Sequence, residues 1–266
     1  MIKEEAYIRT AIKAAIEGGE AIMEVYATDF DVILKEDASP VTVADQKANL
    51  IINNYLEATQ VPIISEENKQ IDFNTRKHWK NCWIVDPLDG TKEFIKRNGE
   101  FTVNIALVKS GSPYLGVIYI PVTKALYFTS YNAKKSYKYI VDIDEEVSVE
   151  KIMNDAIQIT PSEKKEPIKI LGSRSHLNEA TKHFISEVEK VYKVNIISRG
   201  SSLKFCAIAE GEAHIYPRFA PTMEWDTAAG HAICKAVGIE VINQETQKPL
   251  QYNKENLLNP YFLVGS

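Results

Sequence analysis

Residues 83–91 of this chain read Trp83-Ile84-Val85-Asp86-Pro87-Leu88-Asp89-Gly90-Thr91. The apolar run that ends at Val85 predicts a buried strand, and two carboxylates three residues apart follow it directly. Pro87 fixes one backbone angle and Asp89-Gly90 is a strong turn pair, so we expect the chain to bend there. Mg²⁺ is commonly held by one or two carboxylates together with substrate phosphates. The stretch predicts a metal site at a strand end, although by itself it also fits an ordinary Asp-Gly turn.

Elements on either side of this stretch are predicted from their hydrophobic spacing. Apolar positions at helical spacing predict a helix over residues 3–27, and Thr42 can cap a second helix that follows it. A short strand over residues 61–64 leads into Glu66-Glu67. Residues 90–95 resemble the start of a short helix, whose free backbone N–H groups could receive a phosphate.

Period-two patterns follow, and then strands alternate with helices. Four strands are predicted within residues 101–141, with short turns between them, which favours an antiparallel meander. Beyond an irregular, charged segment, strands and helices alternate as far as a last strand over residues 239–242. We therefore predict an α+β or α/β fold with two parts: an N-terminal domain over residues 1–150 and a C-terminal α/β domain over residues 151–266.

Composition excludes several classes of function. The chain has 266 residues, 45% of them hydrophobic and 25% charged, with a net charge of −5. No general basic field invites nucleic acid or anionic membrane, and no apolar run is long enough for a membrane span. Three widely spaced cysteines in apolar stretches favour a reducing compartment. We expect a cytoplasmic monomer or homodimer, and peripheral membrane association stays open.

Carboxylates recur at the predicted ends of elements. The candidates are Glu67, Asp86, Asp89 and Asp226. Asp226 also fits a helix N-cap, and Asp45 fits a surface acid favoured by a helix dipole. Crowded carboxylates repel one another without cations, so their combined presence favours a metal site.

The order of these motifs resembles the lithium-sensitive, metal-dependent phosphatases of the inositol monophosphatase superfamily, over nearly the whole chain. Residues 83–107, 35–45 and 172–176 look more like its 3′(2′),5′-bisphosphate nucleotidase branch. Inositol monophosphatases usually carry Thr-Asn-Phe after the Gly-Thr pair, whereas this chain carries Lys92-Glu93-Phe94. The resemblance implies a layered α-β-α-β-α sandwich of the inositol monophosphatase and fructose-1,6-bisphosphatase type.

The resemblance also implies roles for individual residues. Two or three Mg²⁺ ions would be bound by Glu67, Asp86, the backbone carbonyl of Leu88, Asp89 and Asp226. Asp45 and Thr91 would activate the attacking water, with Glu67 nearby. The scissile phosphate would lie on Gly90 and Thr91. Nucleotide contacts would come from Ser201, Lys204, Arg218, Asp226 and His176.

The implied reaction is hydrolysis of the 3′-phosphate of adenosine 3′,5′-bisphosphate to AMP and phosphate, in sulfur assimilation. Such a substrate needs a second anion site for the phosphate that stays, and arginines suit bidentate phosphate contacts. Taken singly, Lys204 and Arg218 each also fit a solvated surface charge. One alternative is an inositol or sugar phosphate monoesterase that uses the same metals. Another is a catalytically silent nucleotide-binding module.

Overall fold

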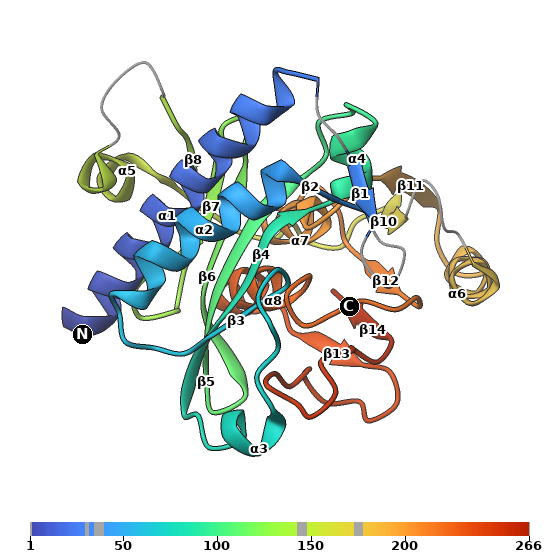
Figure 1. The fold of residues 1–266 in the computed structure, drawn as a ribbon. Helices are drawn as coiled ribbons and strands as arrows, with labels where there is room; N and C mark the ends of the chain where they lie inside the picture. Colours follow the sequence, from blue (N-terminus) through green and yellow to red (C-terminus); the bar gives the residue numbers. More distant parts are fainter. Residues whose placement is uncertain (1, 30–31, 35–39, 143–147, 173–177, 266) are drawn as a thin grey trace.

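A seven-stranded sheet forms the centre of the molecule in this computed structural model (Figure 1). The structure describes residues 2–29, 32–34, 40–142, 148–172 and 178–265. In spatial order the strands are β3 (Ile63–Ser65), β4 (Asn81–Asp89), β5 (Thr102–Lys109), β6 (Ser112–Ile120), β7 (Ala125–Thr129), β8 (Ser136–Ile140) and β9 (Ile157–Ile159). Only β3 and β4 pair in parallel, and the other neighbours pair antiparallel. The predicted meander is confirmed.

Helices cover both faces of this sheet. Helices α1 (Ile2–Tyr26) and α2 (Val43–Glu57) lie side by side across one face (Figure 1). On the other face lie α7 (Leu203–Ala209) and α8 (Ala228–Ala236). Strands covered on both sides are buried at nearly every position, as β5 is. Helix α8 approaches closely because β6 carries Gly116, where a Cβ would lie 2.5 Å from the Ala229 carbonyl oxygen.

A smaller layer lies beyond α7 and α8. It contains the antiparallel sheet β12 (Tyr216–Arg218), β14 (Phe262–Val264) and β13 (Val241–Asn243), and the parallel pair β10 (Ile168–Gly172) and β11 (Val194–Ser198), with α6 (Glu179–Glu189) at the periphery. The predicted layered fold is therefore confirmed. Strand β14 was not predicted, because three residues are too few to show a period. It forms because neighbours pair with it on both sides.

The remaining elements are short. They are β1 (Val32–Leu34), β2 (Pro40–Thr42), α3 (Phe73–Arg76), α4 (Thr91–Ile95) and α5 (Val149–Asp155). Strand β9 extends the central sheet past residue 150, and one hydrophobic cluster joins that sheet to α7 and α8. The division into residues 1–150 and 151–266 stays a prediction.

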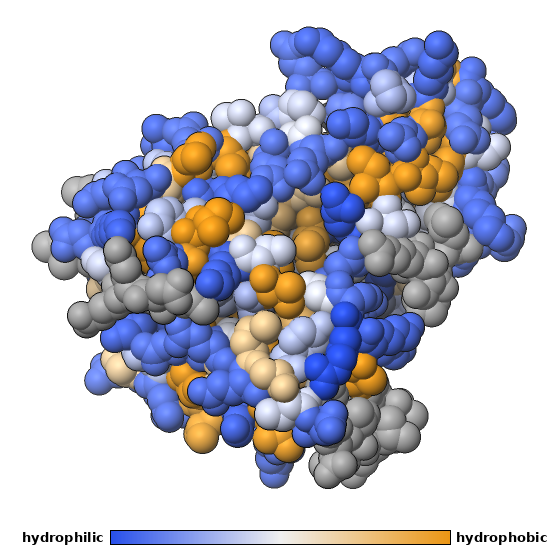
Figure 2. Space-filling view, turned by 90° about the horizontal axis from the view of Figure 1, so that it is seen from above, coloured by the Kyte–Doolittle hydropathy of each residue, from blue (hydrophilic) through white to orange (hydrophobic). Residues whose placement is uncertain are grey.

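The surface is mostly hydrophilic on the face seen from above, with hydrophobic residues exposed in separate groups (Figure 2). Within the described ranges, no helix is both long enough and apolar enough to span a membrane. All three cysteines are buried free thiols.

Candidate active site

Asp86 and Asp89 lie where β4 loses its regular pairing with β5. Residues three apart on a regular strand point to opposite faces, because side chains alternate with period two. The pairing register shifts between Asp86 and Asp89, and Pro87 lies within the shifted segment. A shift of this kind redirects side chains. Both carboxylates thereby come close to Asp226. The charge of Asp89 raises the pKa of Asp226 and of Asp86, and the charge of Asp226 also raises the pKa of Asp86.

Three carboxylates from distant parts of the chain come together at this point. Oxygens of Glu66, Asp86 and Asp226 all lie within 4.8 Å of one another. Glu66 belongs to this group because Ser65 pairs in parallel with Val85, so the next residue of each strand lies beside the other. The backbone N–H of Glu66 continues the ladder with a 3.2 Å bond to the Val85 carbonyl oxygen.

The sequence prediction chose the neighbouring Glu67 as the metal ligand and missed Glu66. The charge of Glu67 acts on Asp45, where it helps to raise the pKa. The role of Glu67 as a ligand stays a prediction. Both glutamates were visible in the sequence, but only the register of β3 against β4 places Glu66 beside Asp86.

The charges of this cluster make it a suitable cation site. Burial raises the pKa of Asp86 well above its usual range, and Glu66 and Asp89 raise it further. Burial likewise raises the pKa of Asp226 to about 8, and Asp89 adds to the effect. A divalent cation would relieve this repulsion and supply the compensating charge. The donor set is all oxygen, which fits hard cations such as Mg²⁺.

Asp45 is a buried residue, which makes the alternative of a surface acid wrong. Its side chain is 2% exposed, and it closes a capping box at the start of α2. Its Oδ2 accepts hydrogen bonds of 2.7 Å from both the backbone N–H and the hydroxyl of Thr42. Its Oδ1 lies 3.1 Å from the Thr91 hydroxyl oxygen. Burial raises the pKa of Asp45, while the bonds from Thr42 lower it.

Thr91 and Leu88 complete the turn after β4. The Thr91 hydroxyl lies within 3.3 Å of the Leu88 carbonyl oxygen as well as near Asp45. The Leu88 N–H donates to Asp86 Oδ1 at 3.0 Å. Gly90 has φ +95°, and a Cβ there would lie 3.1 Å from the Glu100 carbonyl oxygen. Glycine is therefore required for the chain to turn into α4.

Asp226 does not cap α8 with its side chain, so the predicted N-cap is wrong. The N-cap residue is Thr227, and it makes no side-chain capping bond. Asp226 Oδ2 instead accepts a 2.8 Å hydrogen bond from the backbone N–H of Met223. This bond closes the backbone turn over residues 223–226, from which the Asp226 carboxylate joins the three-carboxylate group.

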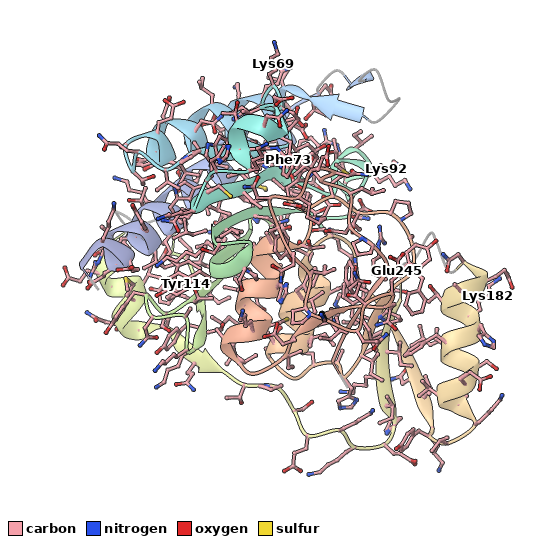
Figure 3. All side chains as sticks on the ribbon, turned by 90° about the horizontal axis from the view of Figure 1, so that it is seen from below. Lys69, Phe73, Lys92, Tyr114, Lys182 and Glu245 are labelled. Carbon is pink, nitrogen blue, oxygen red and sulfur yellow. The ribbon has the colours of Figure 1, made fainter. Side chains whose placement is uncertain are left out.

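A cavity of about 420 Å³ opens beside the carboxylates. Its lining includes the carboxylates of Asp89, Asp226, Glu93 and Glu100 together with five cations: Lys92, Lys96, Arg199, Lys204 and Arg218. In Figure 3, Lys92 projects from α4, whereas Lys182 lies away on the peripheral helix α6. The cavity therefore brings carboxylates and cations together in one lining.

Two predicted nucleotide contacts line this cavity, Ser201 on the loop before α7 and Lys204 in the first turn of that helix. Ser201 has φ +45°, a strained value for a residue with a side chain. Its hydroxyl lies 2.8 Å from that of Thr102. Lys204 is buried, and its Nζ donates to the Ser201 carbonyl oxygen at 2.8 Å. Burial lowers the pKa of Lys204 to about 8, although the charge of Asp89 opposes this.

The same loop supports Asp89 through polar residues that the sequence did not indicate. The Ser202 hydroxyl donates to Asp89 Oδ2 at 3.0 Å. Asn104 Nδ2 in turn donates to Ser202 Oγ at 2.9 Å. These side chains come from β5 and from the residue just before α7, and their polar character in buried segments was the only available signal.

Arg218 shows the clearest unfilled bonding capacity. It ends β12 and lines the cavity, and its Nη2 donates to the Pro221 carbonyl oxygen at 3.2 Å. Its buried Nε has no hydrogen-bond partner within the part of the chain that the structure describes. A buried donor of this kind costs free energy unless it is satisfied, which points to an anion in the cavity. The predicted contact His176 lies outside the described residues.

The chain is similar to known proteins over nearly its whole length. The sequence model of the inositol monophosphatase family matches residues 3–261. The 3′(2′),5′-bisphosphate nucleotidase CysQ of Escherichia coli K12 is 45% identical over 256 residues, covering 94% of this chain and 96% of that protein. The crystal structure of CysQ from Bacteroides thetaiotaomicron has a TM-score of 0.89 and 46% identity, covering 98% of this chain and 97% of that one. The suhB protein of Bartonella henselae shares the fold, with a TM-score of 0.73 and 24% identity over 97% and 92% of the two chains.

Proposed function

This chain belongs to the inositol monophosphatase family, and from that premise we propose that it is a 3′(2′),5′-bisphosphate nucleotidase. The reaction would remove the 3′-phosphate of adenosine 3′,5′-bisphosphate and release AMP and phosphate. One observation carries the proposal. Three carboxylates have oxygens within 4.8 Å of one another, and one of them, Asp226, lines a cavity that five Lys and Arg side chains also line. We place the enzyme in the cytoplasm, in the recycling of nucleotides that sulfur assimilation leaves.

The cofactor in this proposal is Mg²⁺, as two or three ions. Glu66, Asp86, Asp89 and Asp226 would hold them, with the Leu88 carbonyl oxygen and Glu67 as further ligands. When bound, such ions neutralise charge on the transferring phosphoryl group and make a bound water more acidic. Phosphate monoesters hydrolyse extremely slowly unaided, so this electrostatic contribution must be large.

Asp45 and Thr91 would activate the attacking water. Both bonds from Thr42 reach Oδ2 of Asp45, which leaves Oδ1 for the Thr91 hydroxyl at 3.1 Å. A hydroxyl that donates to Asp45 can itself accept a hydrogen bond from water. The proton of that water would pass to Thr91 Oγ as the Thr91 proton passes to Asp45. The raised pKa of Asp45 suits it to receive a proton.

The cations of this cavity would bind the nucleotide. Arg218 Nε is a buried donor without a partner among the described residues, and Lys204 adds charge beside Ser201. Gly90 and Thr91 would hold the scissile phosphate next to the carboxylates. The phosphate that stays on the substrate would then lie on the Arg218 side of the cavity, which a substrate with a single phosphate leaves empty.

Rates on two substrates test this assignment. We expect Mg²⁺-dependent phosphate release from adenosine 3′,5′-bisphosphate, inhibited by Li⁺, to be much faster than release from inositol 1-phosphate. Arg218→Met should raise KM for the bisphosphate more than KM for inositol 1-phosphate, because only the bisphosphate carries the second anion. Faster turnover of inositol 1-phosphate would instead favour an inositol phosphatase, and no turnover of either substrate would favour a silent nucleotide-binding module.

A further inference from the structure

A chain of buried hydrogen bonds runs from α8 towards the turn that carries Asp226. His231 on α8 is fully buried, and its Nε2 lies 2.9 Å from Glu240 Oε2. Its Nδ1 lies 3.0 Å from the Tyr252 hydroxyl oxygen. That hydroxyl lies 3.3 Å from Thr227 Oγ1. Thr227 directly follows Asp226 and lines the same cavity.

The two hydroxyl groups in the middle of this series each have a single proton to donate. The Thr227 hydroxyl has one proton, which it donates to the Glu224 carbonyl oxygen at 3.2 Å. The Tyr252 hydroxyl has one proton and two partners, Thr227 Oγ1 and His231 Nδ1, and the tautomer of His231 decides which of them receives it. Each side chain in this series of hydrogen bonds is bonded to the next one, and the loss of one side chain leaves a buried polar group unpaired.

The turn itself is held from the same side by the segment that follows Tyr252. Asn259 Nδ2 donates to the Met223 carbonyl oxygen at 2.7 Å and to Thr227 Oγ1 at 3.0 Å. The Glu224 side chain is fully buried and accepts a 3.0 Å bond from the backbone N–H of Lys254. These contacts fix the backbone on both sides of Asp226. The Asp226 carboxylate is in turn fixed by the N–H of Met223.

We propose that the chain Glu240–His231–Tyr252–Thr227 positions Asp226 for metal binding. None of its members touches the cluster, so each acts through the backbone of the 223–227 turn. Metal ligands need fixed orientations, and the residues that hold them in place by hydrogen bonds contribute strongly to metal affinity. The inference rests on the proposed function in one respect, which is that Asp226 binds a metal ion.

Tyr252→Phe tests the chain, because it removes one hydroxyl and keeps the ring. Tyr127→Phe is the matched control: each ring is 3% exposed, and the Tyr127 hydroxyl bonds Glu210 at 2.9 Å outside the site. We expect calorimetric Mn²⁺ affinity to fall about tenfold in Tyr252→Phe, the lower end for losing a partner behind a metal ligand. Tyr127→Phe should lose stability but keep the wild-type Mn²⁺ affinity.

A second pair of variants guards against a simple folding defect. An Asn side-chain amide can place a donor or an acceptor near the position of a histidine Nδ1, so His231→Asn should retain more Mn²⁺ affinity than His231→Leu. Equal Mn²⁺ affinity in wild type, Tyr252→Phe and His231→Leu would overturn the positioning role and leave the proposed function intact. Absence of Mn²⁺ binding in the wild type would overturn the proposed function itself, and the positioning role with it.

Discussion

Asp226→Asn should stabilise the protein at alkaline pH in the presence of a chelator, although it removes a metal ligand. Burial, Asp89 and Glu66 raise the pKa of Asp226 from 3.8 to about 8. A rise of that size corresponds to roughly 6 kcal/mol against the ionised form in the folded state. Relaxation of the carboxylates and entry of water reduce this figure, so we expect a gain of about 2–4 kcal/mol for the variant.

The sign of the pH dependence follows from proton binding. Because the folded protein holds the Asp226 proton more tightly than the unfolded chain, this group stabilises the fold at low pH. That contribution is lost as pH rises towards the raised pKa of about 8. Wild type with chelator should therefore lose stability from about pH 5 to about pH 8.5, and Asp226→Asn should lose less. Asp86, whose pKa is also raised, keeps part of the dependence in both proteins.

Urea unfolding at those two pH values, with chelator and then with excess Mg²⁺, measures these differences. Metal binding to the folded state should raise the stability of wild type and have little effect on Asp226→Asn. The reasoning would be refuted by a variant that is no more stable than wild type at alkaline pH with chelator. It would equally be refuted if Mg²⁺ stabilised both proteins to the same extent.

Three further predictions concern the site and its support. Glu66→Gln should weaken Mg²⁺ affinity about tenfold or more, and by more than Glu67→Gln does, because Glu66 belongs to the three-carboxylate group and Glu67 does not. Titration calorimetry on both variants measures the two affinities, and the reverse order would restore the choice of Glu67 made from sequence. Thr91→Val should lower kcat by about 10²-fold or more with little change in metal affinity, since it removes the hydroxyl beside Asp45. An unchanged kcat in steady-state assays would exclude proton transfer from water through Thr91 to Asp45. Gly230→Ala should lower the free energy of unfolding in urea by about 1–3 kcal/mol, because its Cβ would lie 2.3 Å from the Phe205 ring. An unchanged free energy of unfolding would mean that α7 and α8 can move apart freely.

The sequence predicted most elements of the fold because each depends on local pattern. Helix α2 begins where Thr42 was expected to cap it, and the four strands of the meander lie where period-two runs indicated. The prediction was weaker for elements defined by distant partners. Strand β14 has three residues and exists through its pairing with β12 and β13.

The carboxylates show the same division. Asp45, Asp86, Asp89 and Asp226 were chosen from motifs, and the structure brings them into one electrostatic neighbourhood. The alternatives for Asp45 and Asp226 failed for a tertiary reason. Asp45 would be a surface acid on an isolated helix, but packing of the turn after β4 buries it. Asp226 would cap an isolated α8, but the turn at Met223 takes its carboxylate instead.

By itself the sequence determined the kinds of groups at the site, namely oxygen ligands for a hard cation, a Thr–Asp pair and nearby cations. Those follow from residue chemistry and from turn signals that act within a few positions. Tertiary structure alone decided that Glu66 lies beside Asp86, because that depends on the register of two parallel strands some 20 residues apart in sequence. It also decided which buried side chains stand behind Asp89 and Asp226. Contacts between residues about a hundred positions apart, such as Ser202 with Asp89, arise only when the layers pack, and no local pattern encodes them.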